Sequence, residues 1–143
     1  EIYTLSLHDA LPISLGREYA PPGVLAGAMR YHGVAPIVSS LYREKYIEAV
    51  AHGQIQSYSA GLMFTRAEGI VLSPHAMYTV KEVIEQALRS KEAGTDDTIL
   101  FTVTPAINAE SSPYDSLLDG VMHDEKPEEV SLKKSLGRFI GRG

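Results

Sequence analysis

The sequence predicts an α/β fold in which helices pack on a partial parallel sheet. Apolar residues recur every three or four positions over 75–93, which predicts a long amphipathic helix. Gly94 and the polar residues Thr95–Asp97 end this helix in a turn. The run Thr98–Val103 then carries apolar residues on both faces, as buried strands of parallel sheets do. A helix, a short turn and a two-sided strand in this order indicate an α/β layer.

Shorter elements are expected before and after this unit. Pro36 suits the first turn of an amphipathic helix, because its missing N–H costs nothing there. Residues 46–51 are typical of a short strand. Residues 54–68 have helical spacing, and Gly69 is placed to end that helix. A short helix is expected to begin at Tyr114.

The long helix also contains a favourable spacing of opposite charges. Glu85 and Arg89 are four residues apart, and such pairs stabilise a helix by a few tenths of a kcal/mol. Past Asn108 the periodicity fails. Residues 121–143 are expected to form a weakly ordered tail, which is charged from His123 onward.

Composition excludes several classes of protein. The 143 residues carry a formal net charge of −5, which gives no reason to expect nucleic acid or an anionic membrane surface as a partner. No apolar run reaches the roughly 18 residues of a membrane span. The absence of cysteine excludes a disulfide framework and a thiolate metal site, and it is compatible with a cytoplasmic protein. A hydrophobic content of 44% suits a globular core.

The first thirteen residues, Glu1–Ile13, resemble an in-frame translation of a sequencing-library adapter. The alternative is a genuine N-terminal strand or helix built on the leucines of this segment. We set the segment aside from the fold, as is appropriate for an artefact. Without it the chain has 13 basic and 16 acidic residues, a formal charge of −3.

The loop before the first expected helix is a candidate ligand-binding edge. Arg30, Tyr31 and His32 lie between Gly27 and Gly33. The two glycines permit backbone angles or close approaches that a Cβ would block. Such loops can bind ligands, although most of them only connect elements of secondary structure.

The run AGAMRYHGVAPIVSSL, residues 26–41, resembles a signature of tryptophan synthase beta chains. It is similar to their divergent second class rather than to the form that pairs with an alpha subunit. The resemblance covers about residues 15 to 120 and continues through residues 17–22, 66–71, 98–101 and 114–115. It implies that residues 14–120 are the C-terminal part of a fold type II pyridoxal-phosphate enzyme.

The resemblance implies a lyase that converts serine and indole to tryptophan by β-replacement. In this family a lysine holds pyridoxal 5′-phosphate as a Schiff base and a Gly-rich loop binds its phosphate. Both belong to earlier parts of the family's sequence and neither is recognised in this chain, so the chain alone is expected to be inactive. The resemblance also implies a cytoplasmic parent protein that forms a homodimer and uses a small amino-acid substrate.

Two residues correspond to the family's cofactor site. Thr104 takes the place of a serine whose hydroxyl faces the pyridine nitrogen; otherwise it caps the end of a strand. His75 takes the place of a glutamate beside the cofactor ring; otherwise it is a polar residue in the first turn of its helix. An imidazole changes charge near neutral pH and does not replace a fixed anion. Pro105–Ile107 replace glycines of the family, which narrows the backbone conformations available.

The resemblance assigns roles to the glycine-bounded loop as well. Arg30 resembles the arginine near the side chain of the amino-acid substrate, although pairing with a surface acid is an equally good explanation. The backbone oxygens of Tyr31 and Gly33 are candidates to coordinate a monovalent cation, Na⁺ or K⁺. Hard cations need only such oxygens.

Departures from the family leave a second hypothesis open. His75 and the loop Thr104–Ile107 are consistent with a relative that has lost catalysis and acts as a binding or interaction protein. The His-Gln pair that is common in the second class is replaced here by Gly53-Gln54. The histidines do not form a recognisable metal-binding spacing.

Overall fold

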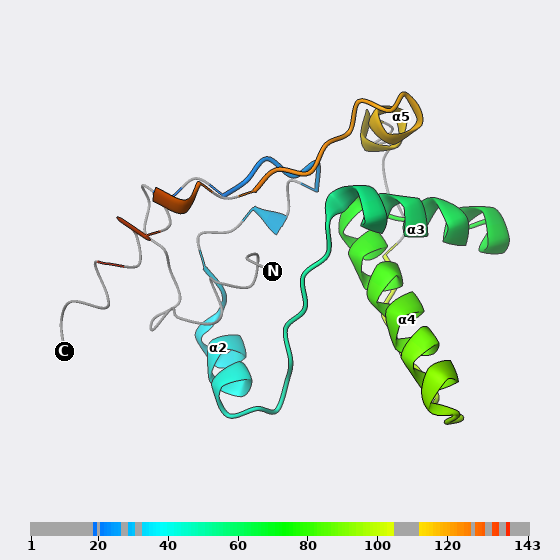
Figure 1. Ribbon diagram of the computed structural model, residues 1–143, viewed down its shortest axis with the longest axis horizontal. Coiled ribbons are helices and arrows are strands. Elements are labelled where there is room, and N and C mark those ends of the chain that lie inside the picture. The colour runs from blue at the N-terminus through cyan, green and yellow to red at the C-terminus, as the bar shows by residue number, and fades with distance from the viewer. Residues whose placement is uncertain are drawn as a thin grey trace. The chain divides into compact units, whose positions relative to one another are not determined.

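The computed structural model describes residues 19, 21–26, 29–30, 33–104, 112–126, 128–130, 133–134 and 137. Their helices are α2, Pro36–Arg43; α3, Gln54–Glu68; α4, Pro74–Ala93; and α5, Ser112–Leu118 (Figure 1). The chain divides into two units: residues 25–27 with 52–124, and the remaining segments. In the described part of the chain no helix has the length and apolar character that a bilayer crossing requires. The adapter-like segment 1–13 lies outside the described residues.

Helix α2 forms where the sequence predicts it, with Pro36 in its first turn. The amide of Ser39 donates to the carbonyl of Ala35 at 3.1 Å, which closes the first turn. None of the helix's residues is buried, and Ile37 is 69% exposed. The apolar side of α2 is therefore uncovered within the described residues.

The strand predicted over 46–51 does not form. This segment begins in turns and bends after α2, and Tyr46 is 79% exposed. A strand is stable only when a neighbouring strand accepts and donates its backbone hydrogen bonds, and no such neighbour is present in the described residues. Strand-forming residue types were not sufficient here.

Helices α3 and α4 confirm the two longer helices, and both end at the predicted glycines. Gly69 and Gly94 have φ of 72° and 67°, in the left-handed region. Their amides donate to the carbonyls of Thr65 at 2.9 Å and Lys91 at 3.2 Å. A Cβ at either glycine would meet no atom within 4 Å, so the positive φ rather than crowding favours glycine.

The core lies mainly between α3 and α4, which cross in Figure 1. Tyr58 on α3 and Met77 on α4 are fully buried, together with Leu72 from the connection between them. The ring of Tyr58 meets the rings of Tyr78 and Tyr114 edge to face, with centroids 6.4 Å apart in each pair. Such aromatic pairs add to the stabilisation from buried area.

Close approach of the two helices depends on Gly61. A Cβ there would lie 2.5 Å from Cγ of Met77, closer than carbon atoms pack. Met77 is buried on all sides and has little room to move. Packing therefore requires a glycine at position 61, although glycine has a low helix propensity.

Residues 98–103 run alongside this core without forming the predicted strand. Phe101 and Val103 pack against the core, whereas Leu100 is 97% exposed. The prediction of two buried faces is therefore wrong for this chain. Leu72 forms an isolated bridge, and the described residues contain no strand of a sheet. Residues 98–103 therefore have no regular secondary structure, and the described residues offer no strand for them to pair with.

Helix α5 forms near the predicted position, and the chain after it returns to α3. Met122 is 9% exposed and belongs to the core cluster. The carboxylate of Asp124 accepts the amides of Gln54 at 2.6 Å and Ile55 at 3.2 Å. Residues 121–124, assigned to the tail from the sequence, therefore include side chains that pack on or cap α3.

The charged side of α4 is arranged around Glu82 rather than the predicted Glu85–Arg89 pair. Oε1 of Glu82 accepts from Nη2 of Arg89 at 2.6 Å, and Oε2 lies 2.8 Å from Nε2 of His52. Glu85 instead pairs with Lys81. Partial burial raises the pKa of Glu82, but the hydrogen bonds from His52, Gln86 and Arg89 and the charge of Arg89 outweigh it, so the pKa is lowered.

We expect Glu82→Gln to reduce the acid sensitivity of the fold. A carboxyl whose pKa is lowered on folding contributes stability that is present above its unfolded pKa, 4.5, and is lost as pH falls through the lower folded value. Thermal unfolding between pH 7 and pH 3 should show a smaller loss of Tm in the variant. Glu92→Gln, at an exposed position on the same helix, is the control. An unchanged pH profile in Glu82→Gln would contradict the assignment.

Candidate functional site

The structure brings the two predicted cofactor residues to one junction. The amide of Ser73 donates to the carbonyl oxygen of Thr104 at 2.9 Å. Oγ of Ser73 lies 3.2 Å from Nε2 of His75, in the first turn of α4. Segments about thirty residues apart in the sequence therefore meet through Ser73.

Ser73 was not singled out from the sequence. It is 7% exposed and holds the N-cap position of α4, just before Pro74. Serine followed by proline is a common helix start, although the Ser73 side chain makes no capping hydrogen bond. Nothing in the sequence pointed to a link between Ser73 and Thr104. That link depends on which segment returns to the start of α4, and the spacing of residues does not reveal it.

The junction is held in place by Tyr114 of α5. Its hydroxyl donates to the carbonyl of Leu72 at 2.9 Å and accepts from the amide of Leu72 at 3.2 Å. Leu72 is fully buried, so both backbone groups of the residue before Ser73 are paired inside the core. Tyr114 thereby fixes the approach to the first turn of α4.

The groups at the junction are neutral or weakly basic. Thr104 is partly buried and carries a hydroxyl, while His75 is exposed. The start of α4 adds the partial positive charge of a helix N-terminus. A hydroxyl can donate a hydrogen bond to a ring nitrogen, and an imidazole can donate or accept. The junction therefore contains one hydroxyl and one imidazole that are able to form hydrogen bonds.

The loop assigned to substrate and cation belongs to the other unit. Arg30 is exposed, and its Nη2 donates to the carbonyl of Pro21 at 3.2 Å, so its described contact is a backbone oxygen rather than a surface acid. Gly33 is partly buried in the approach to α2. Tyr31 lies outside the described residues.

A second polar cluster, found only from the structure, surrounds the start of α3. Oε1 of Gln54 accepts the amide of Leu25 at 3.2 Å, and its Nε2 donates to the carbonyl of His123. A Cβ at position 53 would lie 2.8 Å from Oδ2 of Asp124. Glycine at this position, where the resemblance leads us to expect histidine, leaves room for the carboxylate that caps α3.

Tyr78 lies close to this cluster and packs edge to face with Tyr58. Burial raises the pKa of Tyr78 to about 12, and the charge of Asp124 adds to the effect. Its buried hydroxyl has no hydrogen-bond partner among the described residues. Tyr78 therefore stays a neutral phenol at neutral pH and contributes packing rather than a basic group.

Among the described residues, the unit that contains α3, α4 and α5 brings the segments of His75 and Thr104 together at the start of α4. No family model matches the chain. It is 40% identical over 111 residues to tryptophan synthase beta chain 2 of Aquifex aeolicus (strain VF5), covering 78% of this chain and 26% of that protein. It is 34% identical over 139 residues to tryptophan synthase beta chain 2 of Pyrococcus abyssi (strain GE5 / Orsay), covering 92% and 32%.

A third relative, the tryptophan synthase beta chain of Thermococcus onnurineus (strain NA1), is 37% identical over 117 residues, covering 82% of this chain and 26% of its own length. Over its matched residues the chain belongs to the tryptophan synthase beta chain family. It spans 24–32% of the length of the curated relatives that it matches. The family resemblance recognised in the sequence is thereby confirmed.

Proposed function

We propose that this chain is the C-terminal part of a tryptophan-synthase-beta-like lyase that uses pyridoxal 5′-phosphate to convert serine and indole to tryptophan. The observation that supports the proposal best is the 2.9 Å hydrogen bond from the amide of Ser73 to the carbonyl of Thr104. It joins the two segments that the family resemblance places at the cofactor ring. The relatives' names supply the reaction class.

The chemistry of these residues fits one edge of the cofactor. When bound, pyridoxal phosphate supplies an electron sink for carbanion chemistry. Thr104 offers a neutral hydroxyl donor to the ring nitrogen. His75, in the first turn of α4, offers an imidazole. A hydroxyl partner leaves the ring nitrogen largely unprotonated, which favours elimination over transamination.

The burial pattern of residues 99–103 supports the proposed fold type II architecture. Ile99, Phe101 and Val103 are partly buried, while Leu100 between them is exposed. This alternation is that of a strand with one covered face. In the longer polypeptide, which we call the parent, adjacent strands would pair with its backbone and complete the parallel sheet.

The remaining roles follow from the family. In the parent, Arg30 lies near the substrate side chain, and backbone oxygens of Tyr31 and Gly33 coordinate Na⁺ or K⁺. The Schiff-base lysine and phosphate loop are supplied by other parts of the parent, so this chain alone is inactive. The parent is a cytoplasmic homodimer. We also assign residues 14–120 to the enzyme and residues 1–13 to a translated adapter.

The deciding experiment is recovery of the complete reading frame and purification of the parent. We expect a visible absorbance band from the lysine-bound cofactor and tryptophan formation from serine and indole. A parent without this band and without an upstream lysine and phosphate loop would refute the proposal.

In the parent, Thr104→Val should weaken retention of pyridoxal phosphate about tenfold. Valine keeps the shape of threonine but removes the hydroxyl, and one hydrogen bond is worth roughly 0.5–1.5 kcal/mol. Thr104→Ser, which keeps the hydroxyl, is the control and should retain the cofactor. Equilibrium dialysis followed by absorbance measures this without an activity assay. Equal retention of pyridoxal phosphate by the two variants would show that the hydroxyl of Thr104 does not help to bind the cofactor.

The second candidate is a relative that has lost catalysis and acts as a binding or interaction protein. It is favoured by His75, which replaces a fixed anion with an exposed imidazole. Under this hypothesis the parent forms no tryptophan from serine and indole. Activity that rises in His75→Glu of the parent would indicate that the rest of the catalytic site is intact and that this one substitution is limiting.

A further inference from the structure

Helix α3 presents a second apolar face on the side away from its buried one. Residues 54, 57, 58 and 61 form the buried stripe. Ile55, Leu62 and Met63 recur at the same helical spacing on another stripe, where Ile55 is 39% and Met63 56% exposed. An apolar stripe on a helix normally packs against another element of the protein.

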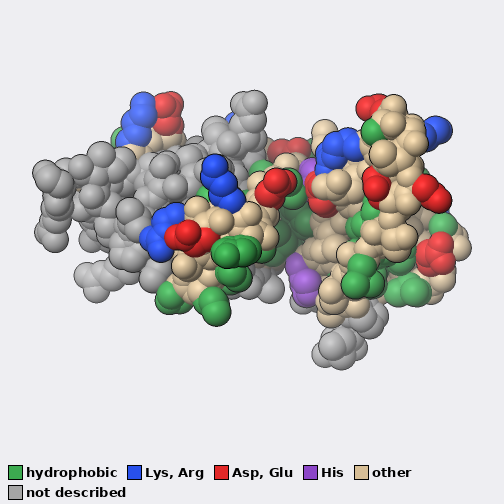
Figure 2. All heavy atoms as spheres, turned by 90° about the horizontal axis from the view of Figure 1, so that it is seen from below, with side chains coloured by type: hydrophobic (Ala, Val, Ile, Leu, Met, Phe, Trp, Pro, Cys, Tyr) green, Lys and Arg blue, Asp and Glu red, His purple; other side chains and the backbone are tan. Residues whose placement is uncertain are grey.

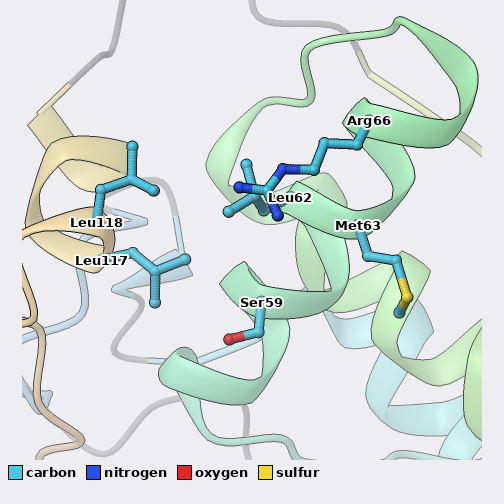
Figure 3. Close-up of a pocket in the computed structure, with 6 residues that line it drawn as sticks. All are labelled: Ser59, Leu62, Met63, Arg66, Leu117 and Leu118. Atoms are coloured by element: carbon cyan, nitrogen blue, oxygen red, sulfur yellow. The ribbon is translucent and has the colours of Figure 1, made fainter.

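This second face is one wall of an open groove between α3 and α5 of about 580 Å³ (Figure 3). Ser59, Leu62, Met63 and Arg66 line it from α3, and Leu117 and Leu118 line it from α5. In Figure 3 the two leucines of α5 point across the gap toward Leu62. Leu118 is 62% exposed, so most of its apolar side chain faces water.

The groove also contains one cationic group. The guanidinium of Arg66 reaches over Leu62 in Figure 3, and within the described residues no ion pair is found for it. Acidic residues outnumber basic ones in the whole sequence, 18 against 13. Figure 2 shows apolar side chains and acidic ones exposed together on one face. Because the lining combines leucine side chains with Arg66, an occupant with apolar side chains and a carboxylate would complement it.

We propose that the α3–α5 groove docks a segment of the parent polypeptide that lies outside this chain and that carries an apolar residue and a carboxylate. This inference rests on the proposed function. The relatives are three to four times longer than the stretch matched here, since the match spans 26–32% of their length. That length supplies an intramolecular partner, whose docking costs less entropy than the binding of a separate molecule.

The test uses thiol labelling, because the chain has no cysteine of its own. Leu118→Cys places a thiol in the groove, and Asp96→Cys places one in the exposed turn after α4 as the control. We expect a maleimide to label Cys at position 118 rapidly in this chain and about 100-fold more slowly in the parent, because labelling then requires local opening. The control should label at similar rates in both, read by mass spectrometry of the peptides.

Arg66→Glu tests the charge requirement. In the parent it should raise the labelling rate at position 118 about tenfold by repelling the partner carboxylate, whereas Arg66→Lys should not. Equal labelling of position 118 in chain and parent overturns the proposal. Protection that appears in this chain alone and grows with its concentration also overturns it, because the occupant is then a second copy. Labelling does not depend on the cofactor. A parent in which position 118 is protected from the maleimide but which binds no pyridoxal phosphate would therefore refute only the proposed function.

Discussion

Met77→Ala is expected to lower the free energy of unfolding by about 2–5 kcal/mol, the range for truncating a buried methionine. Met77 has no exposed surface and packs against Gly61 from the facing helix. Truncation leaves a cavity at the point where α3 and α4 approach most closely, and the helices cannot close it without breaking other contacts. Urea denaturation followed by circular dichroism measures the change.

The matched control is Met63→Ala on α3. This methionine is 56% exposed, so the same truncation removes much less buried surface. We expect a change within about 0.5 kcal/mol in this chain. If the two variants lost similar stability, the packing of α4 on α3 described above would be incorrect.

Gln54→Leu is expected to cost about 2 kcal/mol, because it leaves two polar backbone groups without their partners. Gln54 is 5% exposed and bonds to the amide of Leu25 and to the carbonyl of His123. Leucine is close in volume but can satisfy neither group. The loss should therefore come from unpaired hydrogen bonds rather than from a cavity.

Hydrogen exchange separates this mechanism from a general loss of stability. For each amide, the exchange rate in Gln54→Leu is compared with the rate in the unsubstituted chain. The increase should be larger for the amide of Leu25 than for the amides in the middle of α4. Gln56→Leu, at an exposed position of the same helix, should change neither exchange nor stability. Unaltered exchange at Leu25 in Gln54→Leu would show that the side chain does not hold this segment.

The helices could be predicted because their signals are local. Gly69 and Gly94 end α3 and α4 through a positive φ that glycine adopts without strain. Pro36 begins α2 for the equally local reason that its ring suits a first turn. The strands could not be predicted in the same way. Residues 46–51 and 98–103 have suitable compositions, but a strand also requires a partner.

The roles assigned to the site residues stay predictions, and the structure adds how two of their segments are connected. His75 and Thr104 were identified by resemblance, and the structure joins their segments through Ser73. Asp124 was missed, since nothing near it in the sequence shows that its carboxylate caps a helix seventy residues earlier. Gly53 looked like a departure from the family, and the structure explains it as space for that carboxylate.

The sequence by itself determined the family and the positions of α2, α3 and α4. Both the family motifs and the signals that begin and end helices consist of residues that are close together in the sequence. Only the tertiary structure decided which side chains are buried, how Gly61 meets Met77 and which polar groups surround Gln54. These depend on contacts between distant segments, whose geometry is set by packing rather than by spacing along the chain.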